Sequence, residues 1–277
     1  MPQTKREIDA ILQAAQTRPR HRFGQNFMVE PSLVRIIADA GELLPGERVI
    51  EVGPGTGTLT DELLERGAVV TAVEIDRDLA AAARERYGDR LVVVEGDALA
   101  GKHELHPAVH AAASAGAKLV ANLPYNIASP LVIELLIAGS PLLAFTVQRE
   151  VADRLSAGPT DGKSYGPLSV VVQSIATVEV MRNIPPSAFW PQPKITSSLV
   201  RLRRDIRLDG DLPGFGRFVG ELFGQRRKAL RNPLGKVVGD RLADVLSTAG
   251  LTGEERAGEV PPATYRSLYE AATSKTR

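Results

Sequence analysis

The fold is decided by one stretch of nine residues, Val49-Ile50-Glu51-Val52-Gly53-Pro54-Gly55-Thr56-Gly57. It starts with the apolar pattern of a buried strand and ends in a glycine-rich turn before a helical pattern at 59–66. Glycines let a backbone turn sharply and approach a ligand closely. The dinucleotide-binding fingerprint needs Gly-x-Gly-x-x-Gly, whereas the spacing here is Gly-x-Gly-x-Gly, which suits a pyrophosphate poorly. The stretch predicts a strand, a turn and a helix that form a cofactor site, with a purely structural turn as the alternative.

Strand and helix patterns alternate on both sides of this stretch. Strands are predicted at 48–52, 69–75, 91–94, 118–121, 142–147, 170–184 and 197–202, and helices at 59–66, 79–87 and 131–138. Such alternation is typical of a parallel sheet covered by helices on both faces. The last two strands are expected to finish the sheet as an antiparallel pair. The prediction is a Rossmann-like α/β fold with a mostly parallel seven-stranded sheet.

The C-terminal part has a different pattern. Short helical segments at 215–223, 241–249 and 263–272 are separated by Gly and Pro. We therefore expect two domains, 1–207 with the sheet and 208–277 as a small all-helical domain. The Ala-rich segment 108–117 is interpreted as a surface connector.

Composition excludes several classes of function. With 43% hydrophobic and 24% charged residues in 277, the chain resembles ordinary globular proteins. It has no cysteine, which excludes disulfides, thiolate metal sites and a cysteine nucleophile. No apolar run approaches the roughly 18 residues of a membrane span, so a cytoplasmic protein is expected. His103, His106 and His110 are not joined by a cluster of carboxylates or cysteines and are interpreted as a surface loop, so no metal site is predicted.

Charge is distributed unevenly although the net charge is only +1. Residues 182–236 contain 12 Lys or Arg and 4 Asp or Glu, a net charge of +8, which leaves −7 for the remainder. A basic face on an otherwise acidic protein is the usual electrostatic signature of a polyanion-binding surface. A solvated face without a partner is the alternative.

Two carboxylates follow the second and third predicted strands. Glu74 ends the second strand, and a carboxylate there can accept both hydroxyls of a ribose. Asp97 follows the third strand and can accept a hydrogen bond from an adenine amino group. Each residue alone could be a helix cap. Together with the glycine turn they favour a ligand that contains adenine and ribose but no phosphate, which indicates S-adenosylmethionine.

A further motif, Asn122-Leu123-Pro124-Tyr125, follows the fourth strand. The Asn122 amide oxygen and the Leu123 carbonyl can accept both N–H groups of an exocyclic amine on a planar base. Pro124 stiffens the turn, and Tyr125 offers a ring for stacking. This combination predicts a site that holds the amine with its lone pair towards an electrophile.

The chain resembles the KsgA-type ribosomal RNA adenine dimethyltransferases, a branch shared with the Erm enzymes. The matching segments run along the whole chain: 22–27, 51–57, Glu74, 96–99, 122–126, 148–152, 165–169, 189–194 and 223–228. Their number and order make the resemblance specific, although no single one would. It implies a class I methyltransferase fold with S-adenosyl-L-methionine as cofactor.

The resemblance also implies roles for individual residues. Gln25 and Asn26 would approach the methionine end of the cofactor, close to the backbone of Met28, where family members usually carry Leu. A polar helix cap before Pro31 is the alternative for Gln25 and Asn26. The full expected cofactor-binding set is Gln25, Asn26, Met28, Gly53, Gly55, Glu74, Asp97 and Asn122.

The target amine is a poor nucleophile because its lone pair is delocalised into the ring, so orientation and alignment are expected to drive transfer without a strong general base. Tyr125 should stack on one face of the base and Phe189 on the other, with Trp190 packing in the core. Core packing is the alternative for both Phe189 and Trp190. The expected catalytic set is Asn122, Leu123, Pro124, Tyr125 and Phe189.

Basic side chains are expected to contact RNA phosphates, which position an RNA but do not read its sequence. The expected set is Arg201, Arg203, Arg204, Arg226, Arg227, Lys228 and Arg231. The target adenines should lie in a loop or a single strand, because A-form helices hide their bases.

The resemblance implies dimethylation of two adjacent adenines near the 3′ end of 16S ribosomal RNA in the small subunit, together with a role in small-subunit biogenesis. An Erm-type enzyme acting on 23S ribosomal RNA and a mainly non-catalytic assembly factor remain alternatives. The basic segment and the helical domain disfavour a small-molecule methyltransferase. A monomer is expected.

Overall fold

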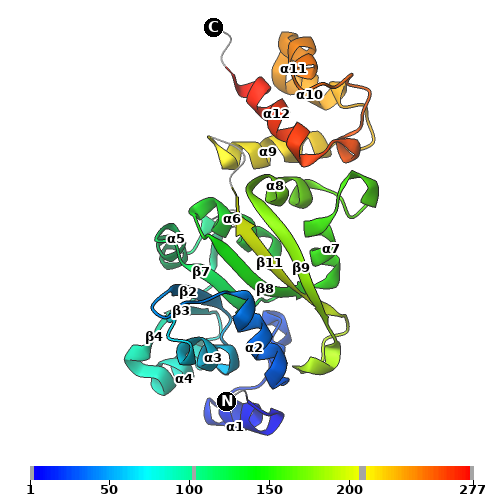
Figure 1. Ribbon diagram of the computed structural model, residues 1–277. Helices are drawn as coiled ribbons and strands as arrows, with labels where there is room; N and C mark the ends of the chain where they lie inside the picture. The colour runs from blue at the N-terminus through cyan, green and yellow to red at the C-terminus, as the bar shows by residue number, and fades with distance from the viewer. Residues whose placement is uncertain (1–2, 102–103, 206–209, 275–277) are drawn as a thin grey trace. The chain divides into compact units, whose positions relative to one another are not determined.

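The computed structural model describes residues 3–101, 104–205 and 210–274 (Figure 1). Its contacts divide the chain into two compact units, Met1–Ala152 with Glu179–Arg204, and Asp153–Val178 with Asp205–Arg277. The second unit thus includes residues 153–178, which the division at 207/208 had placed with the sheet. No helix among the described residues is long and apolar enough to cross a membrane.

A seven-stranded sheet forms the centre of the first unit. Its strand order is β4-β3-β2-β7-β8-β11-β9. The strands are β2 Arg48–Val52, β3 Val69–Glu74, β4 Leu91–Glu95, β7 Lys118–Asn122, β8 Leu142–Gln148, β9 Ala176–Ile184 and β11 Ser197–Arg204. The pairs among β4, β3, β2, β7 and β8 are parallel, and β11 runs antiparallel to β8. The predicted fold class is confirmed.

Helices cover the sheet because its strands are apolar on both faces. Val49, Ile50, Val70 and Leu119 are at most 1% exposed. The helices of this unit are α1 Lys5–Ala14, α2 Pro31–Ala40, α3 Thr58–Glu65, α4 Arg77–Tyr87, α5 Pro107–Ser114 and α6 Ala128–Ala138. Helix α2 contacts α3, and α5 contacts α6, with the two pairs on opposite faces of the sheet (Figure 1). This arrangement leaves the carboxyl ends of the parallel strands free to form a site.

The strand order reverses direction between β2 and β7. From β2 the chain proceeds through β3 to β4 on one side, and later through β7 to β8 on the other. Loops at the carboxyl ends of β2 and β7 therefore lead away from each other and leave a crevice between them. Both the glycine-rich turn and the Asn122 motif follow these two strands, so the topology brings them together.

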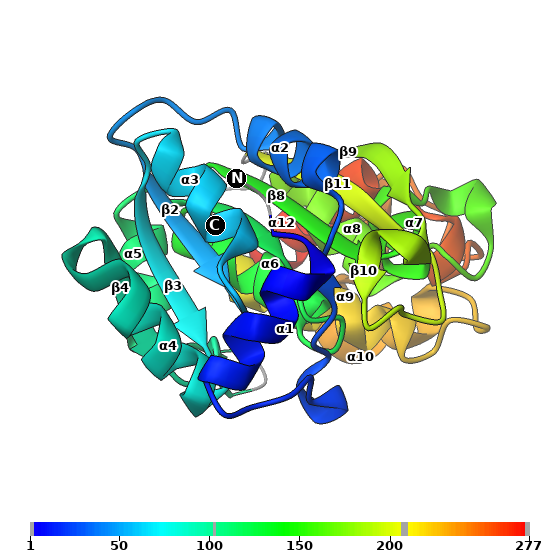
Figure 2. The same cartoon turned by 90° about the horizontal axis from the view of Figure 1, so that it is seen from below.

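An N-terminal segment that the sequence patterns did not predict adds to this edge. Strand β1, Phe27–Met28, pairs antiparallel with β10, Phe189–Trp190. Helix α1 lies in front of the sheet when the molecule is seen from below (Figure 2). The Gln3 side chain connects this segment to the glycine turn by donating to the Thr56 carbonyl at 2.8 Å.

Two sequence predictions about secondary structure were wrong. Residues 170–175, expected as part of a strand, belong to helix α8, Pro167–Ile175. Pro167 at the first helical position and the Gly166 N–H bond to Ser169 Oγ, 3.1 Å, start a helix despite three consecutive valines. The expected connector at 108–117 is largely helix α5, whose buried Val109 and Ala113 pack inward.

The second unit is helical in its C-terminal part, as predicted. Its helices there are α9 Leu212–Phe223, α10 Arg231–Val238, α11 Leu242–Thr248 and α12 Pro262–Thr273, with α8 from the earlier segment; α7, Arg149–Ser156, begins before it. Aromatic rings make its core: Phe223 lies 5.7 Å from Tyr265 and 6.1 Å from Tyr165 between centroids. The buried Tyr165 hydroxyl donates to the Val260 carbonyl at 2.6 Å, which gives the 165–169 motif a structural role.

Candidate active site

A pocket lies at the carboxyl ends of β2, β3, β4 and β7. Its lining includes the 22–28 segment, the glycine turn, the ends of β3 and β4 and the 122–127 segment. All but one of the residues expected to bind the cofactor or the target base line it; the exception is Phe189. The structure therefore brings together side chains that are up to about a hundred positions apart in the sequence.

The glycine turn takes two different roles. Gly53 has φ +72°, and a Cβ there would meet the Pro124 ring at 3.6 Å, so this glycine brings the turn close to the 122–125 motif. Gly57 has φ +87°, and a Cβ there would lie 2.0 Å from the Tyr87 hydroxyl. That hydroxyl donates to Asp61 at 2.8 Å, beneath the turn. Gly57 is thus needed for packing, whereas Gly53 lines the pocket.

Glu74 is the buried carboxylate of the pocket, with 3% of the residue exposed. It accepts backbone N–H bonds from Gly55 at 3.1 Å and Asp76 at 2.9 Å, one on each oxygen. Burial raises the pKa of Glu74, and these backbone bonds act in the opposite direction. Each oxygen keeps a lone pair for a further donor. The arrangement suits the two hydroxyls of a ribose.

The next strand end provides a second, exposed carboxylate. Asp97 Oδ1 accepts the Leu99 N–H at 3.0 Å, which orients the side chain at the pocket rim. Ile75, which the sequence analysis did not single out, follows Glu74 and also lines the pocket with 42% of its surface exposed. An apolar residue directly after the carboxylate at the strand end is the sequence signal that could have identified it, because such a side chain can offer a flat base an apolar surface.

Asn122 is held from two sides. Its Nδ2 donates to the Asn26 carbonyl at 2.9 Å, and its Oδ1 accepts a hydrogen bond from Thr146 Oγ1. An amide oxygen has two lone pairs, so Oδ1 can accept one more donor from the pocket. Asn122 is partly exposed and lines the pocket. Its geometry matches the predicted role of an acceptor for an exocyclic amine.

The following residues also lie as the motif suggests. Leu123, Pro124 and Tyr125 line the pocket, with the Leu123 side chain buried and the other two partly exposed. The Tyr125 hydroxyl makes a 2.6 Å hydrogen bond with Ser197 Oγ, which fixes the end of the ring. Burial raises the pKa of Tyr125, so the phenol stays neutral and stacking is its available interaction.

Phe189 does not stand at the pocket mouth, and that prediction was wrong. The residue is 3% exposed, belongs to the hydrophobic core with Met28 and Leu33, and does not line the pocket. Pairing of β10 with β1 holds it there, opposite Met28. Trp190 is the less buried of the two rings and stacks on Phe27, with centroids 6.5 Å apart.

Gln25 lines the pocket but its amide is already occupied. It accepts the Arg20 N–H at 2.7 Å and donates to Asp76 at 3.0 Å. Arg20 also bridges Asp76 and Asp78, at 2.8 and 2.5 Å. Gln25 therefore fastens the N-terminal segment to the start of α4. Asn26 likewise contributes through its backbone, because its carbonyl holds Asn122.

Glu51 is a buried carboxylic acid in the lining of the pocket, and it is 1% exposed. Thr60 Oγ1 donates to it at 2.7 Å. Burial raises the pKa of Glu51 to about 8, against its usual value near 4.5. The side chain is therefore largely neutral at pH 7 and acts as a packed polar group within β2.

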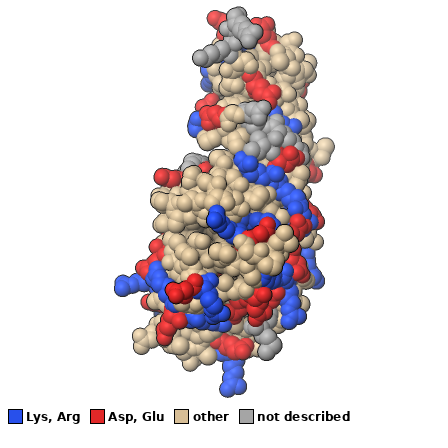
Figure 3. Space-filling model, turned by 60° about the vertical axis from the view of Figure 1, so that its left-hand side comes forward, with Lys and Arg blue, Asp and Glu red and all other residues tan. Residues whose placement is uncertain are grey.

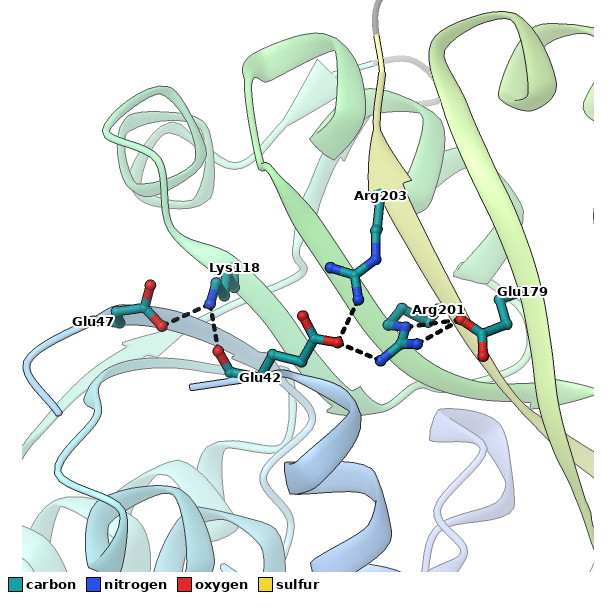
Figure 4. Close-up of polar contacts among 6 residues, drawn as sticks. All are labelled: Glu42, Glu47, Lys118, Glu179, Arg201 and Arg203. Carbon is teal, nitrogen blue, oxygen red and sulfur yellow. Dashed lines mark hydrogen bonds and ion pairs between the residues drawn. The ribbon is translucent and has the colours of Figure 1, made fainter. Parts of the chain in front are cut away.

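The basic residues on β11 have partners within the chain, and their expected role as phosphate contacts stays a prediction. Arg201 donates to Glu42 at 2.7 Å and to Glu179 at 2.6 Å, and Arg203 pairs with the same Glu42 (Figure 4). Arg204 donates to the Leu136 carbonyl at 2.7 Å. These bonds tie β11 to other segments of the first unit.

The remaining expected RNA contacts lie in the second unit. Arg226 donates to the Gly162 carbonyl, and Arg231 pairs with Glu254. Arg227 and Lys228 are exposed, and within the described part of the chain neither forms an ion pair. On the face shown in Figure 3, Lys and Arg lie beside Asp and Glu, so charge is interspersed rather than uniform.

The histidines of the 103–110 segment have ordinary structural roles where the structure describes them. His106 caps α5, with Nδ1 accepting the Ala108 N–H at 3.2 Å, and His110 lies within the same helix. His103 lies outside the described residues. In the ranges 3–101, 104–205 and 210–274 no three His, Cys, Asp or Glu side chains are grouped to hold a metal.

Comparison with known proteins agrees with this geometry. The family model "Ribosomal RNA adenine dimethylase" matches residues 16–274. Ribosomal RNA small subunit methyltransferase A of Aromatoleum aromaticum is 44% identical over 223 residues, covering 78% of this chain and 81% of that protein. The protein of the same name from Deinococcus radiodurans is 39% identical over 268 residues, covering 95% and 89%.

Solved structures show the same fold. The 23S rRNA methyltransferase ErmE has a TM-score of 0.66 at 28% identity, covering 90% of this chain and 100% of that one. A dimethyladenosine transferase from Plasmodium falciparum has a TM-score of 0.70 at 24% identity, covering 87% and 95%. The predicted resemblance, enzyme class and S-adenosylmethionine cofactor are confirmed. This chain belongs to the ribosomal RNA adenine dimethylase family.

Proposed function

We propose that this chain dimethylates N6 of two adjacent adenosines in the 3′-terminal hairpin region of 16S ribosomal RNA, in the small subunit or its precursor. The relatives named for the small subunit support this choice of RNA. The single observation that carries the chemistry is Asn122, whose amide is fixed by Asn26 and Thr146 with one lone pair left towards the pocket.

The pocket fits S-adenosylmethionine on the chemistry of its donors and acceptors. Glu74 would accept the ribose hydroxyls, Asp97 the adenine amino group, and Ile75 would cover the adenine face. Gly53 would allow the backbone to approach. When bound, S-adenosylmethionine supplies an electrophilic methyl group.

Asn122 and the Leu123 carbonyl accept the two N–H groups of the target adenine. This orients the amine and favours the pyramidal geometry needed for attack. Bound S-adenosylmethionine would supply the methyl group to N6, and Asn122 and the Leu123 carbonyl would hold the amine until its proton leaves to water. Tyr125 stacks on the base and keeps it out of its RNA stack. Repetition at both adenosines uses four methyl groups.

Arg227 and Lys228 are proposed as phosphate contacts, since their charges are exposed and free of carboxylate partners in the described chain. Replacing both with Gln should weaken RNA binding at low salt. It should also reduce the slope of log affinity against log salt by about one unit per cation. Arg201, which pairs with Glu42 and Glu179, provides the control, because Arg201→Gln should leave that slope unchanged.

The proposal also includes that the protein is a monomer, acts in the cytoplasm and has an additional role in small-subunit biogenesis.

The test is transfer from labelled S-adenosylmethionine to small-subunit particles and, separately, to large-subunit RNA, followed by mapping of the product. The proposal expects dimethylated adenosine pairs near the small-subunit 3′ end. Product on large-subunit RNA alone would contradict it and favour the specificity named for the ErmE structure. Tight small-subunit binding without product would favour an assembly factor.

A further inference from the structure

Thr146 is a buried hydroxyl next to the active-site amide. It lies on β8 opposite Asn122 of β7 in the parallel register and has 0% of its surface exposed. Its Oγ1 donates to Asn122 Oδ1. Within the described part of the chain, Asn122 is the side chain to which Thr146 is hydrogen-bonded. Thr146 does not line the pocket, so it cannot touch a substrate directly.

The two hydrogen bonds on Asn122 do different things. The Nδ2 bond to the Asn26 carbonyl, 2.9 Å, decides which end of the amide faces the N-terminal segment. One bond still allows the amide plane to swing about its side-chain torsions. The Thr146 bond at the opposite end restricts that swing, and it takes the oxygen lone pair that faces the sheet. The other lone pair is then directed to the pocket.

We propose that Thr146 is a positioning residue for methyl transfer, which acts by holding the Asn122 carbonyl oxygen in the orientation that accepts the adenine N6 proton. The inference rests on the proposed function, because it concerns how the target amine is aligned. Alignment errors near the reacting atoms are costly in rate, of the order of a hundredfold for a displacement of about 1 Å. We expect binding of the cofactor to depend much less on this oxygen, because Glu74 and Asp97 provide the acceptors proposed for its ribose and adenine.

A purely structural role makes a different prediction. A buried hydroxyl needs an acceptor in any protein, and Thr146 could use Asn122 only for that purpose. The chain offers a matched comparison at Ser198, a hydroxyl with 0% exposure on β11 that donates to Asn183 Oδ1 at 2.9 Å. This bond also joins a buried hydroxyl to an asparagine oxygen across neighbouring strands, but Ser198 and Asn183 do not line the pocket. Loss of the Ser198–Asn183 bond should therefore lower the free energy of unfolding without changing the rate of methyl transfer.

The experiment compares wild type with Thr146→Val, Thr146→Ser, Thr146→Ala and Ser198→Ala. The assay is single-turnover transfer at saturating S-adenosylmethionine, on whichever ribosomal RNA the wild type methylates. Cofactor Kd is measured by calorimetry and folding by urea unfolding. We expect Thr146→Val to slow transfer about ten- to hundredfold. We expect cofactor Kd to change less than about twofold and Thr146→Ser to restore most of the rate, with Ser198→Ala at the wild-type rate.

The outcomes separate the two proposals. If Thr146→Val transfers at the wild-type rate, or if Ser198→Ala is slowed equally, the positioning role is overturned while the proposed function stands. If Thr146→Ser is as slow as Thr146→Val, shape rather than the hydroxyl matters, and the proposal again fails. If Thr146→Val does not fold, Thr146→Ala against Thr146→Ser decides. If wild type transfers no methyl to either ribosomal RNA, both proposals fall.

Discussion

The two ends of the same sheet show opposite ways of using polar side chains. At the amino ends of the parallel strands, Glu47 pairs with Lys118, and Glu42 and Glu179 pair with Arg201 and Arg203 (Figure 4). At the carboxyl ends, Glu74 and Asn122 are each fixed by two hydrogen bonds within the chain and also line a pocket.

The difference teaches that incomplete pairing, and not charge density, marks the functional end. At the amino end, three carboxylates pair with three basic side chains, so their charges cancel and their hydrogen bonds are made within the chain. At the carboxyl end, the acceptors of Glu74 and Asn122 are oriented by backbone N–H groups and a buried hydroxyl, while lone pairs stay available. Orientation before binding lowers the cost of recognition. Substitutions at the two ends should therefore have different consequences.

The largest effect is expected from Asn122→Ala. Loss of the amine acceptor should reduce single-turnover methyl transfer by about 10²–10³-fold, by analogy with removal of one preorganised polar group in other active sites. Cofactor Kd should weaken less than about tenfold, because the Asn26 contact is lost but Glu74 remains. Rate assays and calorimetry on the same preparation test this. Equal losses in rate and cofactor affinity would remove the distinction between amine and cofactor contacts.

The next effect concerns pH and Glu51. Its pKa is about 8 in the folded chain and near 4.5 in the unfolded chain, because burial disfavours the charged form. The folded state therefore holds an extra proton between these values, and stability should fall as pH rises from about 4.5 to about 8. Glutamine cannot ionise, so the free energy of unfolding of Glu51→Gln should fall by a few kcal/mol less over this pH range than that of the wild type.

Urea unfolding at a series of pH values measures that decline. Some decline should remain in Glu51→Gln, because the pKa of Glu74 is also raised by burial. Glu47 at the amino end provides a contrast, since its hydrogen bond with Lys118 lowers its pKa. A wild-type curve that is flat between pH 5 and 8 would mean that Glu51 is not buried as described.

Cofactor binding should depend on Glu74. Glu74→Gln replaces a charged acceptor of two hydroxyls with a neutral amide, one end of which is a donor. We expect the Kd for S-adenosylmethionine to rise about ten- to hundredfold. Glu47→Gln, in the paired network at the other end, should leave Kd unchanged. If both substitutions weaken binding equally, the cofactor does not occupy the pocket in the proposed way.

The smallest effect is expected from Glu42→Gln in the paired network. Exposed ion pairs contribute little, so the loss in unfolding free energy should be about 1 kcal/mol or less and should shrink further in high salt. Transfer rate and RNA affinity should not change. Denaturation at low and high salt, with the transfer assay alongside, checks this. A tenfold loss of RNA affinity would show that the network is part of the binding surface.

Much of the sheet was predictable because its signals are local. The apolar runs around Ile50 and Leu119 and the turn at Gly53 identify strands and their order of connection without tertiary information. Helix α8 was missed because its valines favour a strand, whereas Pro167 and Ser169 at its start decide the structure. Helix α5 was missed because Ala-rich composition says little about packing.

Site residues could be predicted from the sequence where their position at the end of a strand is enough to place them in the pocket. Glu74 and Asn122 follow strand ends, so the fold places them in one pocket. Phe189 was misplaced because the pairing of β1 with β10 is a long-range contact that no local pattern reveals. The ion pairs of Arg201 and Arg203 could not be predicted for the same reason, since their partner Glu42 is about 160 positions away in the chain. Thr146 shows no motif, and only the register of β7 with β8 identifies it.

The central claim is that the carboxyl end of the sheet presents an exocyclic adenine amine for methylation. Mass spectrometry of nucleosides from RNA treated with wild type and labelled S-adenosylmethionine tests it most directly. The account predicts N6,N6-dimethyladenosine as the final product, with its formation abolished or greatly slowed in Asn122→Ala and unchanged in Glu42→Gln. Methyl groups on a ring nitrogen, a ribose or another base, or full dimethylation by Asn122→Ala, would contradict it.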